Sequence, residues 1–165
     1  MNNLKELEKK YEELGKEIER LKKEQETVGF RGDPIFLLSK EEYEKYRDRI
    51  PKLGWFWWLK SSGYGSYNAM YVGSDGYVSD IGVSVGNDNV LVRPALRISN
   101  LKSFNSGGKN KIVFNGVTWV KIDENLYISE LPIDFRRFDE ESNNYETSEV
   151  RKFLLNWFEE RQELN

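Results

Sequence analysis

Cysteine and histidine are both absent from this sequence of 165 residues. Without cysteine, disulfides, thiol nucleophiles, iron–sulfur clusters and thiolate zinc sites are excluded. Without histidine, the chain lacks the usual general base and the commonest metal ligand. Five Trp, nine Tyr and nine Phe residues are instead typical of recognition surfaces. We therefore predict that the protein is not an enzyme and that it needs no metal and no cofactor.

Strong charge of one sign and long apolar runs are also missing. Lys and Arg number 25 and Asp and Glu number 28, so the net charge is −3. This mixed balance argues against a binder of duplex DNA, which needs a basic face. No apolar run is long enough to span a membrane, and the opening MNNLKELEKK has no signal-peptide pattern. These features predict a cytoplasmic protein without membrane insertion.

Apolar residues in the segment 1–28 recur at alternating steps of three and four. This spacing is an uninterrupted heptad seam in a segment otherwise rich in Glu, Lys and Arg, and it predicts a coiled-coil helix that joins two or three copies of the chain. A single amphipathic helix folded onto its own domain is the alternative, although a core-facing stripe is normally wider. The seam consists of Leu4, Leu7, Tyr11, Leu14, Ile18, Leu21, Gln25 and Val28.

The remainder, 29–165, has the pattern of an α+β head built from antiparallel hairpins and two short helices. Ser39 and Glu42 form a capping box that predicts a helix from Lys40 to Ile50. Strands are expected at 35–38, 54–60, 69–72, 77–81 and 91–98, and Pro94 disturbs the last of these.

The second half of the head continues the same pattern. Residues 100–111 are polar, carry a Gly pair and are predicted to be a connector. Asn115-Gly116 is a strong hairpin signal between strands at 112–114 and 117–122. A further strand is expected at 126–129, and Ser148 precedes a final amphipathic helix.

The stretch from Trp57 to Ile98 reads WWLKSSGYGSYNAMYVGSDGYVSD…VLVRPALRI. It resembles a bacterial and phage domain family of unassigned function that carries W-W-L-R-S and G-V-R-P-A-L motifs. Asp33–Ile50 is similar to the strand and helix before these motifs, and 117–158 is similar to the other half of the family. There an S-x-x-R-x-x-L-N-x-x-F pattern is matched, with a one-residue slip, by Ser148, Arg151, Leu155, Asn156 and Phe158. The resemblance implies a C-type-lectin-like fold, like that of formylglycine-generating enzymes.

The two halves stand in the opposite order from the resembling family, which indicates a circular permutation. Residues 33–99 and 112–165 would then be the permuted halves, with 100–111 joining the former ends. Because permutation requires neighbouring termini, this hypothesis predicts that Gly29 and Asn165 lie close together. Formylglycine-generating enzymes rely on active-site cysteines, and this chain has none.

Segments 61–68, 73–77 and 84–89 are rich in Tyr, Ser, Gly and Asn, the composition of antibody paratopes. Local turn chemistry produces similar letters, and it also explains Asp75, Asp80, Asn87 and Asp88 better than a calcium site does. Arg93 either contacts a ligand or anchors loops. Trp55, Trp57 and Trp58 either line a groove for a sugar or a peptide or belong to the core. The candidate ligand-binding residues are Tyr64, Tyr67, Asn68, Tyr71, Asp75, Tyr77, Asn87, Asp88, Asn89 and Arg93.

Two functions follow from these observations. The first is a non-enzymatic binding module of a phage or mobile element, multimerised by its coiled coil, that recognises a protein or a glycan. The second is an intracellular, phage-encoded inhibitor of a host defence protein, comparable with anti-CRISPR proteins. The first allows a virion-associated protein after lysis, and the second places the protein in the host cytosol.

Overall fold

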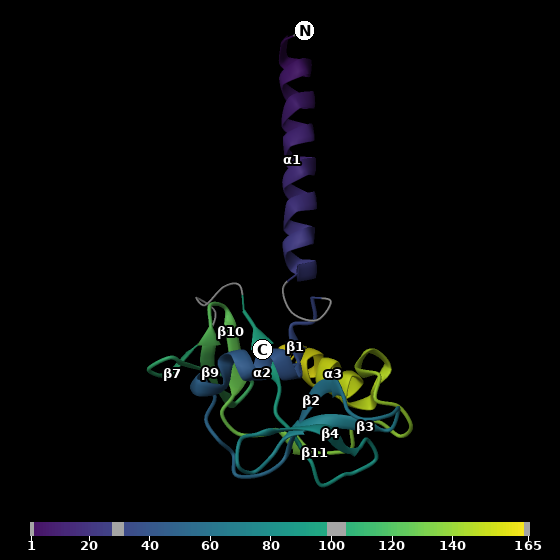
Figure 1. The fold of residues 1–165 in the computed structure, drawn as a ribbon. Helices are drawn as coiled ribbons and strands as arrows, with labels where there is room; N and C mark the ends of the chain where they lie inside the picture. Colours follow the sequence, from purple (N-terminus) through teal and green to yellow (C-terminus); the bar gives the residue numbers. More distant parts are fainter. Residues whose placement is uncertain (1, 28–31, 99–104, 164–165) are drawn as a thin grey trace. The chain divides into compact units, whose positions relative to one another are not determined.

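The computed structural model describes residues 2–27, 32–98 and 105–163 (Figure 1). The chain divides into two compact units, Met1–Pro34 and Ile35–Asn165. Gly29 and Asn165, whose proximity the permutation hypothesis predicts, lie outside the described residues.

The first unit consists of one long helix, α1 (Asn2–Thr27). The helix is confirmed where the heptad pattern predicts it. Its sequence is almost entirely Glu, Lys, Leu and other good helix formers, so local propensity supports it along its whole length. No helix in the described ranges has the length and apolar character that crossing a bilayer requires.

The second unit contains two sheets, which appear as separate groups of strands in Figure 1. The first sheet has six strands, and all of its pairings are antiparallel. In spatial order these are β1 (Ile35–Phe36), β6 (Ala95–Arg97), β10 (Leu126–Ser129), β9 (Val117–Asp123), β8 (Lys111–Phe114) and β7 (Asn105–Gly108). The β8–β9 turn is made by Asn115 and Gly116 with φ of 55° and 73°, as the Asn-Gly hairpin signal predicts.

The second sheet has five strands and includes one parallel pairing, between β2 and β5. In spatial order its strands are β11 (Asp134–Phe135), β5 (Leu91–Val92), β2 (Trp57–Ser62), β3 (Asn68–Val72) and β4 (Val78–Ser84). Because nearly all pairings are antiparallel and the helices do not alternate with the strands, the predicted α+β class is confirmed.

The helices of the head begin at the predicted caps. Ser39 and Glu42 form a complete capping box at α2 (Lys40–Tyr46), and a 3₁₀ turn, η1 (Arg47–Arg49), continues it up to Pro51. A second 3₁₀ turn, η3 (Tyr145–Thr147), leads into α3 (Glu149–Glu163), where Ser148 Oγ accepts a hydrogen bond from the Arg151 amide.

The hydrophobic core lies between the two sheets and beneath α2. Trp57 and Leu59 of β2 pack in one cluster with Ile122 of β9 and Ile128 of β10. Tyr43 of α2 meets the Trp57 ring edge-on, with ring centroids 5.4 Å apart. α3 covers the six-stranded sheet elsewhere, through the ring pairs Phe114–Phe158 and Trp119–Trp157.

Two predictions of local structure are wrong. The strand expected over 91–98 is two strands in different sheets, since the chain changes sheets at Arg93-Pro94, where proline has no amide proton for a ladder. The connector expected at 100–111 contains strand β7 at 105–108, which pairs with β8 despite its polar sequence, and Lys111 already belongs to β8. Residues 99–104 of that connector lie outside the described residues.

Candidate functional site

The structure places two of the three predicted contact segments at opposite ends of the five-stranded sheet. The β2–β3 loop follows the pair Ser62–Ala69 at one end of these strands. The β3–β4 turn, 73–77, lies at the other end, beside the pair Trp57–Val72. The β2–β3 loop and the β3–β4 turn therefore do not lie next to each other.

At the first end, the β2–β3 loop displays two tyrosines. Tyr64 and Tyr67 are 79% and 67% exposed, respectively. Asn143 holds the loop, because its side-chain amide donates to the carbonyl oxygens of Gly65 (2.8 Å) and Asn68 (2.9 Å). Asn143 belongs to none of the motifs or composition patterns of the sequence, so sequence reasoning missed it.

Segment 84–89 connects the two ends. The Val85 amide donates to the Tyr67 carbonyl at the first end. Asn87 Oδ1 accepts a hydrogen bond from the Asn89 amide at 2.9 Å, which is the geometry of a local Asx turn. The side chains of Asp88 and Asn89 are exposed.

The β3–β4 turn is also organised by local hydrogen bonds. Asp75 Oδ1 accepts from the Tyr77 amide at 3.0 Å, as turn chemistry requires. The exposed Tyr77 ring is covered on one side by the Arg47 guanidinium, whose carbon lies 4.0 Å from the ring centroid. Asp80, the remaining residue considered for calcium, forms an ion pair with Lys40.

Next to this turn lies a cluster of three aromatic rings that we call the aromatic platform: Trp55, Phe56 and Tyr71. The Trp55 and Phe56 centroids are 5.5 Å apart, and the Phe56 and Tyr71 centroids are 5.4 Å apart. Of these three residues, only Tyr71 is among the candidate ligand-binding residues predicted from the sequence, while Trp55 is part of an aromatic run for which a groove and the core are the alternatives. Sequence reasoning placed the whole run 54–60 in a strand, whereas β2 begins only at Trp57 and leaves Trp55 and Phe56 exposed.

A feature of the sequence that distinguishes Trp55 from its neighbours is Gly54. Its φ of 73° lies in the left-handed region that favours glycine, so the chain bends there before the strand begins. Trp57 and Trp58, inside the strand, are buried on its two faces: Trp57 packs against Tyr43, and Trp58 packs against a loop.

Arg93 has the anchoring role that the sequence left open as an alternative. Its side chain is fully buried and lies against the Trp57 ring. The guanidinium donates to the carbonyl oxygens of Ser129 (2.8 Å), Pro51 (2.8 Å) and Glu130 (3.3 Å). Burial lowers the pKa of Arg93 to about 10, although the group keeps its charge at neutral pH. It therefore connects both sheets and the segment after α2, and it is not on the surface.

The other strongly shifted group is Tyr46 on α2. Burial and a 2.6 Å hydrogen bond to Asp123 Oδ2 raise the pKa of Tyr46 to about 12. The same hydrogen bond lowers the pKa of Asp123. Both groups connect α2 to β9, and neither is placed as a proton donor or acceptor at neutral pH.

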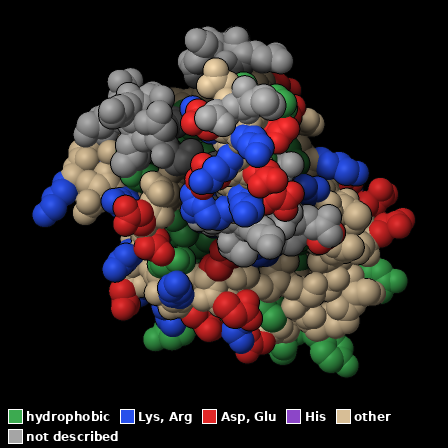
Figure 2. Space-filling view, turned by 90° about the horizontal axis from the view of Figure 1, so that it is seen from above, with side chains coloured by type: hydrophobic (Ala, Val, Ile, Leu, Met, Phe, Trp, Pro, Cys, Tyr) green, Lys and Arg blue, Asp and Glu red, His purple; other side chains and the backbone are tan. Residues whose placement is uncertain are grey.

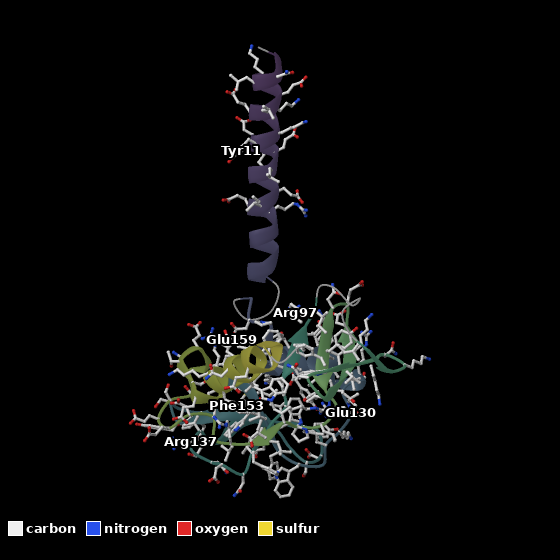
Figure 3. The ribbon with its side chains drawn as sticks, turned by 180° about the vertical axis from the view of Figure 1, so that it is seen from behind. Tyr11, Arg97, Glu130, Arg137, Phe153 and Glu159 are labelled. Atoms are coloured by element: carbon white, nitrogen blue, oxygen red, sulfur yellow. The ribbon has the colours of Figure 1, made fainter. Side chains whose placement is uncertain are left out.

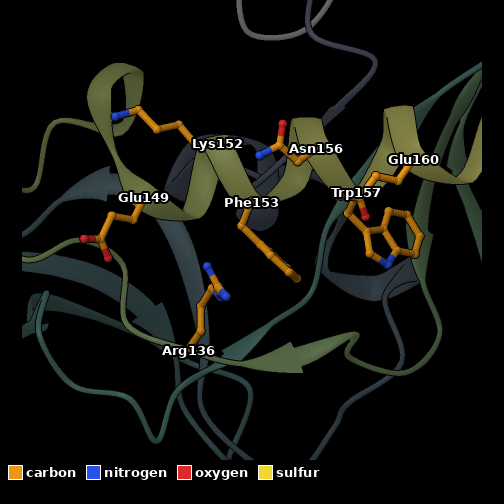
Figure 4. A pocket seen from close by; sticks show the side chains of 7 residues that line it. All are labelled: Arg136, Glu149, Lys152, Phe153, Asn156, Trp157 and Glu160. Atoms are coloured by element: carbon orange, nitrogen blue, oxygen red, sulfur yellow. The ribbon is translucent and has the colours of Figure 1, made fainter.

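A groove runs along α3, and Figure 4 shows the side chains that line it. Arg136 extends beneath the helix with its guanidinium carbon 4.0 Å from the Phe153 ring centroid. The lining carries charges of both signs, since Lys152 lies near Glu149, which is itself paired with Arg137. Within the described ranges, no group of three or more Asp and Glu side chains is arranged to hold a metal ion.

The predicted oligomerisation residues lie along α1 (Figure 3). The side chains of Leu4, Leu7, Tyr11, Leu14 and Ile18 are between 45% and 82% exposed. Leu21 and Gln25 belong to the same helix, but their side chains lie outside the described residues, as does Val28 altogether. Taken by itself, helix α1 therefore leaves the first five positions of this apolar seam uncovered.

Comparison with protein-family models identifies a family for this chain. A family model described as "Domain of unknown function (DUF6273)" matches residues 11–100, which is more than half of the chain. No curated protein and no solved structure matches the chain.

Proposed function

The chain belongs to the DUF6273 family of domains of unknown function, and from this premise we propose that it is a non-enzymatic binding module presented in several copies. In this proposal α1 joins two or three chains, and the head recognises a protein or glycan partner. The C-type-lectin-like fold and the permuted order of its halves are part of the same proposal.

The observation that carries the proposal is the exposed seam of α1. Burying a leucine side chain contributes about 1.5 to 3 kcal/mol, so three leucines and an isoleucine left in water are a substantial cost for an isolated helix. Pairing with the same seam of another copy removes these residues from water in the a and d layers of a coiled coil. Short multimers of this kind give weak individual sites a high combined affinity.

The head supports the binding part of the proposal. Its exposed large hydrophobic side chains are mainly aromatic. Several of them lie on turns that hydrogen bonds hold in place. Its strongly shifted groups, Arg93 and Tyr46, make structural hydrogen bonds. The sequence offers neither of the side chains that most often act as nucleophile and general base, Cys and His.

The oligomerisation part is tested with the double variant Leu7→Asp, Leu14→Asp. Light scattering of the wild type at micromolar concentration is expected to give the mass of two or three chains, and the variant is expected to give the mass of one. The matched control, Lys9→Asp with Lys16→Asp, puts aspartate on the opposite side of the helix and is expected to leave the oligomer intact. A single-chain mass for the wild type contradicts the proposal.

The same variants test how the copies act in binding. Wild type and the Leu7→Asp, Leu14→Asp variant are applied to panels of immobilised glycans and purified cell-envelope proteins. We expect the single-chain variant to bind the same ligand about 100-fold more weakly to a dense surface. A wild-type oligomer that binds nothing on either panel contradicts the binding part, whatever its mass.

A further inference from the structure

The aromatic platform of Trp55, Phe56 and Tyr71 is the feature of the head that its folding leaves unexplained. Trp55 is 47% exposed and Phe56 is 38% exposed, although the next three residues of the chain, which begin strand β2, are buried. The other tryptophans differ: Trp57, Trp58 and Trp119 are buried, and Trp157 packs against Trp119. Trp55 is therefore the most exposed of the described tryptophans.

The platform is held in place before any ligand arrives. The Trp55 indole Nε1 donates to the Asn89 carbonyl at 3.1 Å, which fixes the ring against segment 84–89. The Phe56 carbonyl accepts a hydrogen bond from the Leu91 amide at 2.9 Å, which fixes the backbone beneath the second ring. Because these rings are already ordered, a ligand that stacks on them pays little in side-chain entropy.

The surroundings of the platform favour an uncharged ligand. Five other aromatic rings of the described head have a Lys or Arg group over them, among them Tyr77 and Phe153, but no described cation lies over the three platform rings. The adjacent turn instead exposes the Asp88 carboxylate and the Asn89 amide. On the face of the molecule seen in Figure 2, Lys and Arg side chains are interspersed with Asp and Glu, in keeping with the small net charge of −3. An anionic polymer needs a cationic track, and neither the platform residues nor the 87–89 turn includes a Lys or Arg.

We infer that the aromatic platform, together with the 87–89 turn, is a binding site for a neutral oligosaccharide; this inference rests on the binding function proposed above. The C–H face of a sugar ring carries slight positive charge and packs on the electron-rich face of an aromatic ring. The hydroxyl groups at the edge of the sugar match Asp88, which accepts hydrogen bonds, and Asn89, which both donates and accepts. The site requires no metal ion.

The exposure of Trp55 supplies a direct assay. Tryptophan fluorescence of the full-length wild type is titrated with soluble hexasaccharides of glucose, mannose and N-acetylglucosamine, and with a heparin hexasaccharide as the anionic probe. At least one neutral sugar is expected to give a saturable change in emission and to protect the protein from quenching by acrylamide. The heparin hexasaccharide is expected to give no saturable change.

Variants locate the site. Trp55→Ala is expected to weaken binding of the neutral sugar at least tenfold, measured by calorimetry, whereas Trp55→Phe keeps a ring and is expected to lose less. Ile81→Ala, which removes an exposed apolar side chain beside the β2–β3 loop at the other end of the sheet, is the control and is expected to bind like wild type. Near-ultraviolet circular dichroism confirms that each variant is folded.

The outcomes separate this inference from the function on which it rests. If wild type binds a protein from the panels but no neutral sugar, the sugar site is overturned and the binding function stands. If a neutral sugar binds but Trp55→Ala binds it as well as wild type does, the platform is overturned as its site. If neither panel yields a ligand, both the inference and the proposed function fail.

Discussion

Replacing Arg93 with methionine is expected to destabilise the head more than any other substitution of an arginine in it. The methionine side chain is similar in length, but it donates no hydrogen bonds. The three carbonyl oxygens that Arg93 serves belong to Pro51 after α2, and to Ser129 and Glu130 at the end of β10. Loss of the guanidinium therefore removes a single group that joins three separate segments.

The size of the effect follows from two opposing contributions. A hydrogen bond from a charged donor contributes about 1.5 to 3 kcal/mol, so three of them contribute about 5 to 9 kcal/mol. Burying the cation has a cost, which lowers the pKa of Arg93 from 12.5 to about 10 and corresponds to about 3 kcal/mol. The methionine variant loses the three hydrogen bonds, but it does not bear the cost of burying a cation. The expected net loss in the free energy of unfolding is about 2 to 6 kcal/mol.

Urea unfolding at pH 7, followed by the fluorescence of the buried tryptophans, measures this loss. Arg93→Lys retains a positive charge but cannot place donors on three carbonyls in the fixed fork of a guanidinium, so it is expected to recover only part of the stability. Arg97→Met is the matched control, because Arg97 is near Arg93 in sequence and stacks on the Phe36 ring at 5.3 Å. If Arg93→Met unfolds within about 0.5 kcal/mol of wild type, the anchoring role is refuted.

The remaining predictions concern a glycine and a tyrosine. Gly82→Ala places a Cβ 2.4 Å from the Ala69 carbonyl oxygen at a φ of 81°, so it is expected to cost about 3 kcal/mol or more in urea unfolding, whereas Gly65→Ala, with φ of 70° and open space, is expected to cost only about 1 kcal/mol. Equal losses would contradict this difference. Tyr46 keeps its proton in the folded state until about pH 12, whereas the unfolded chain loses it near pH 10, so stability falls across that interval. Tyr46→Phe is expected to flatten the fall in the urea midpoint, and an unchanged slope would count against the raised pKa of Tyr46.

The parts of the fold that the sequence predicted are those decided by local chemistry. The heptad seam predicted α1, the Ser39–Glu42 capping box predicted the start of α2, and Asn115-Gly116 predicted the β8–β9 turn. Each of these signals is complete within a few neighbouring residues. Their outcome therefore does not depend on where the rest of the chain goes.

The predictions that were wrong concern segments whose structure depends on partners distant in the sequence. Residues 105–108 are polar and rich in glycine, and they become a strand only because β8 offers its edge. Arg93-Pro94 lies in an apolar run, and nothing local indicates that β5 and β6 belong to different sheets. Paired strands at an edge are set by tertiary context more than by intrinsic preference.

In the candidate site, too, local composition was informative and the position of each segment in the fold was not predicted. The Tyr, Ser, Gly and Asn content of segments 61–68, 73–77 and 84–89 identified exposed turns, but composition could not show that strand register places the first two at opposite ends of a sheet. Phe56 was overlooked because a run of aromatic residues next to a strand is normally part of the hydrophobic core.

The α1 seam and the aromatic platform have separate roles in the proposed binding function. Hydrophobic burial in α1 does not depend on which ligand the head recognises, and stacking on the aromatic platform does not depend on how many copies α1 holds together. A neutral sugar stacked on two or three rings binds weakly, since a small ligand gains only part of the free energy that its contacts offer. A site of that strength becomes selective for surfaces that repeat the same sugar when several copies bind at once. In the proposed function the exposed seam and the exposed rings are complementary, because multiplicity would supply the affinity that one neutral site lacks.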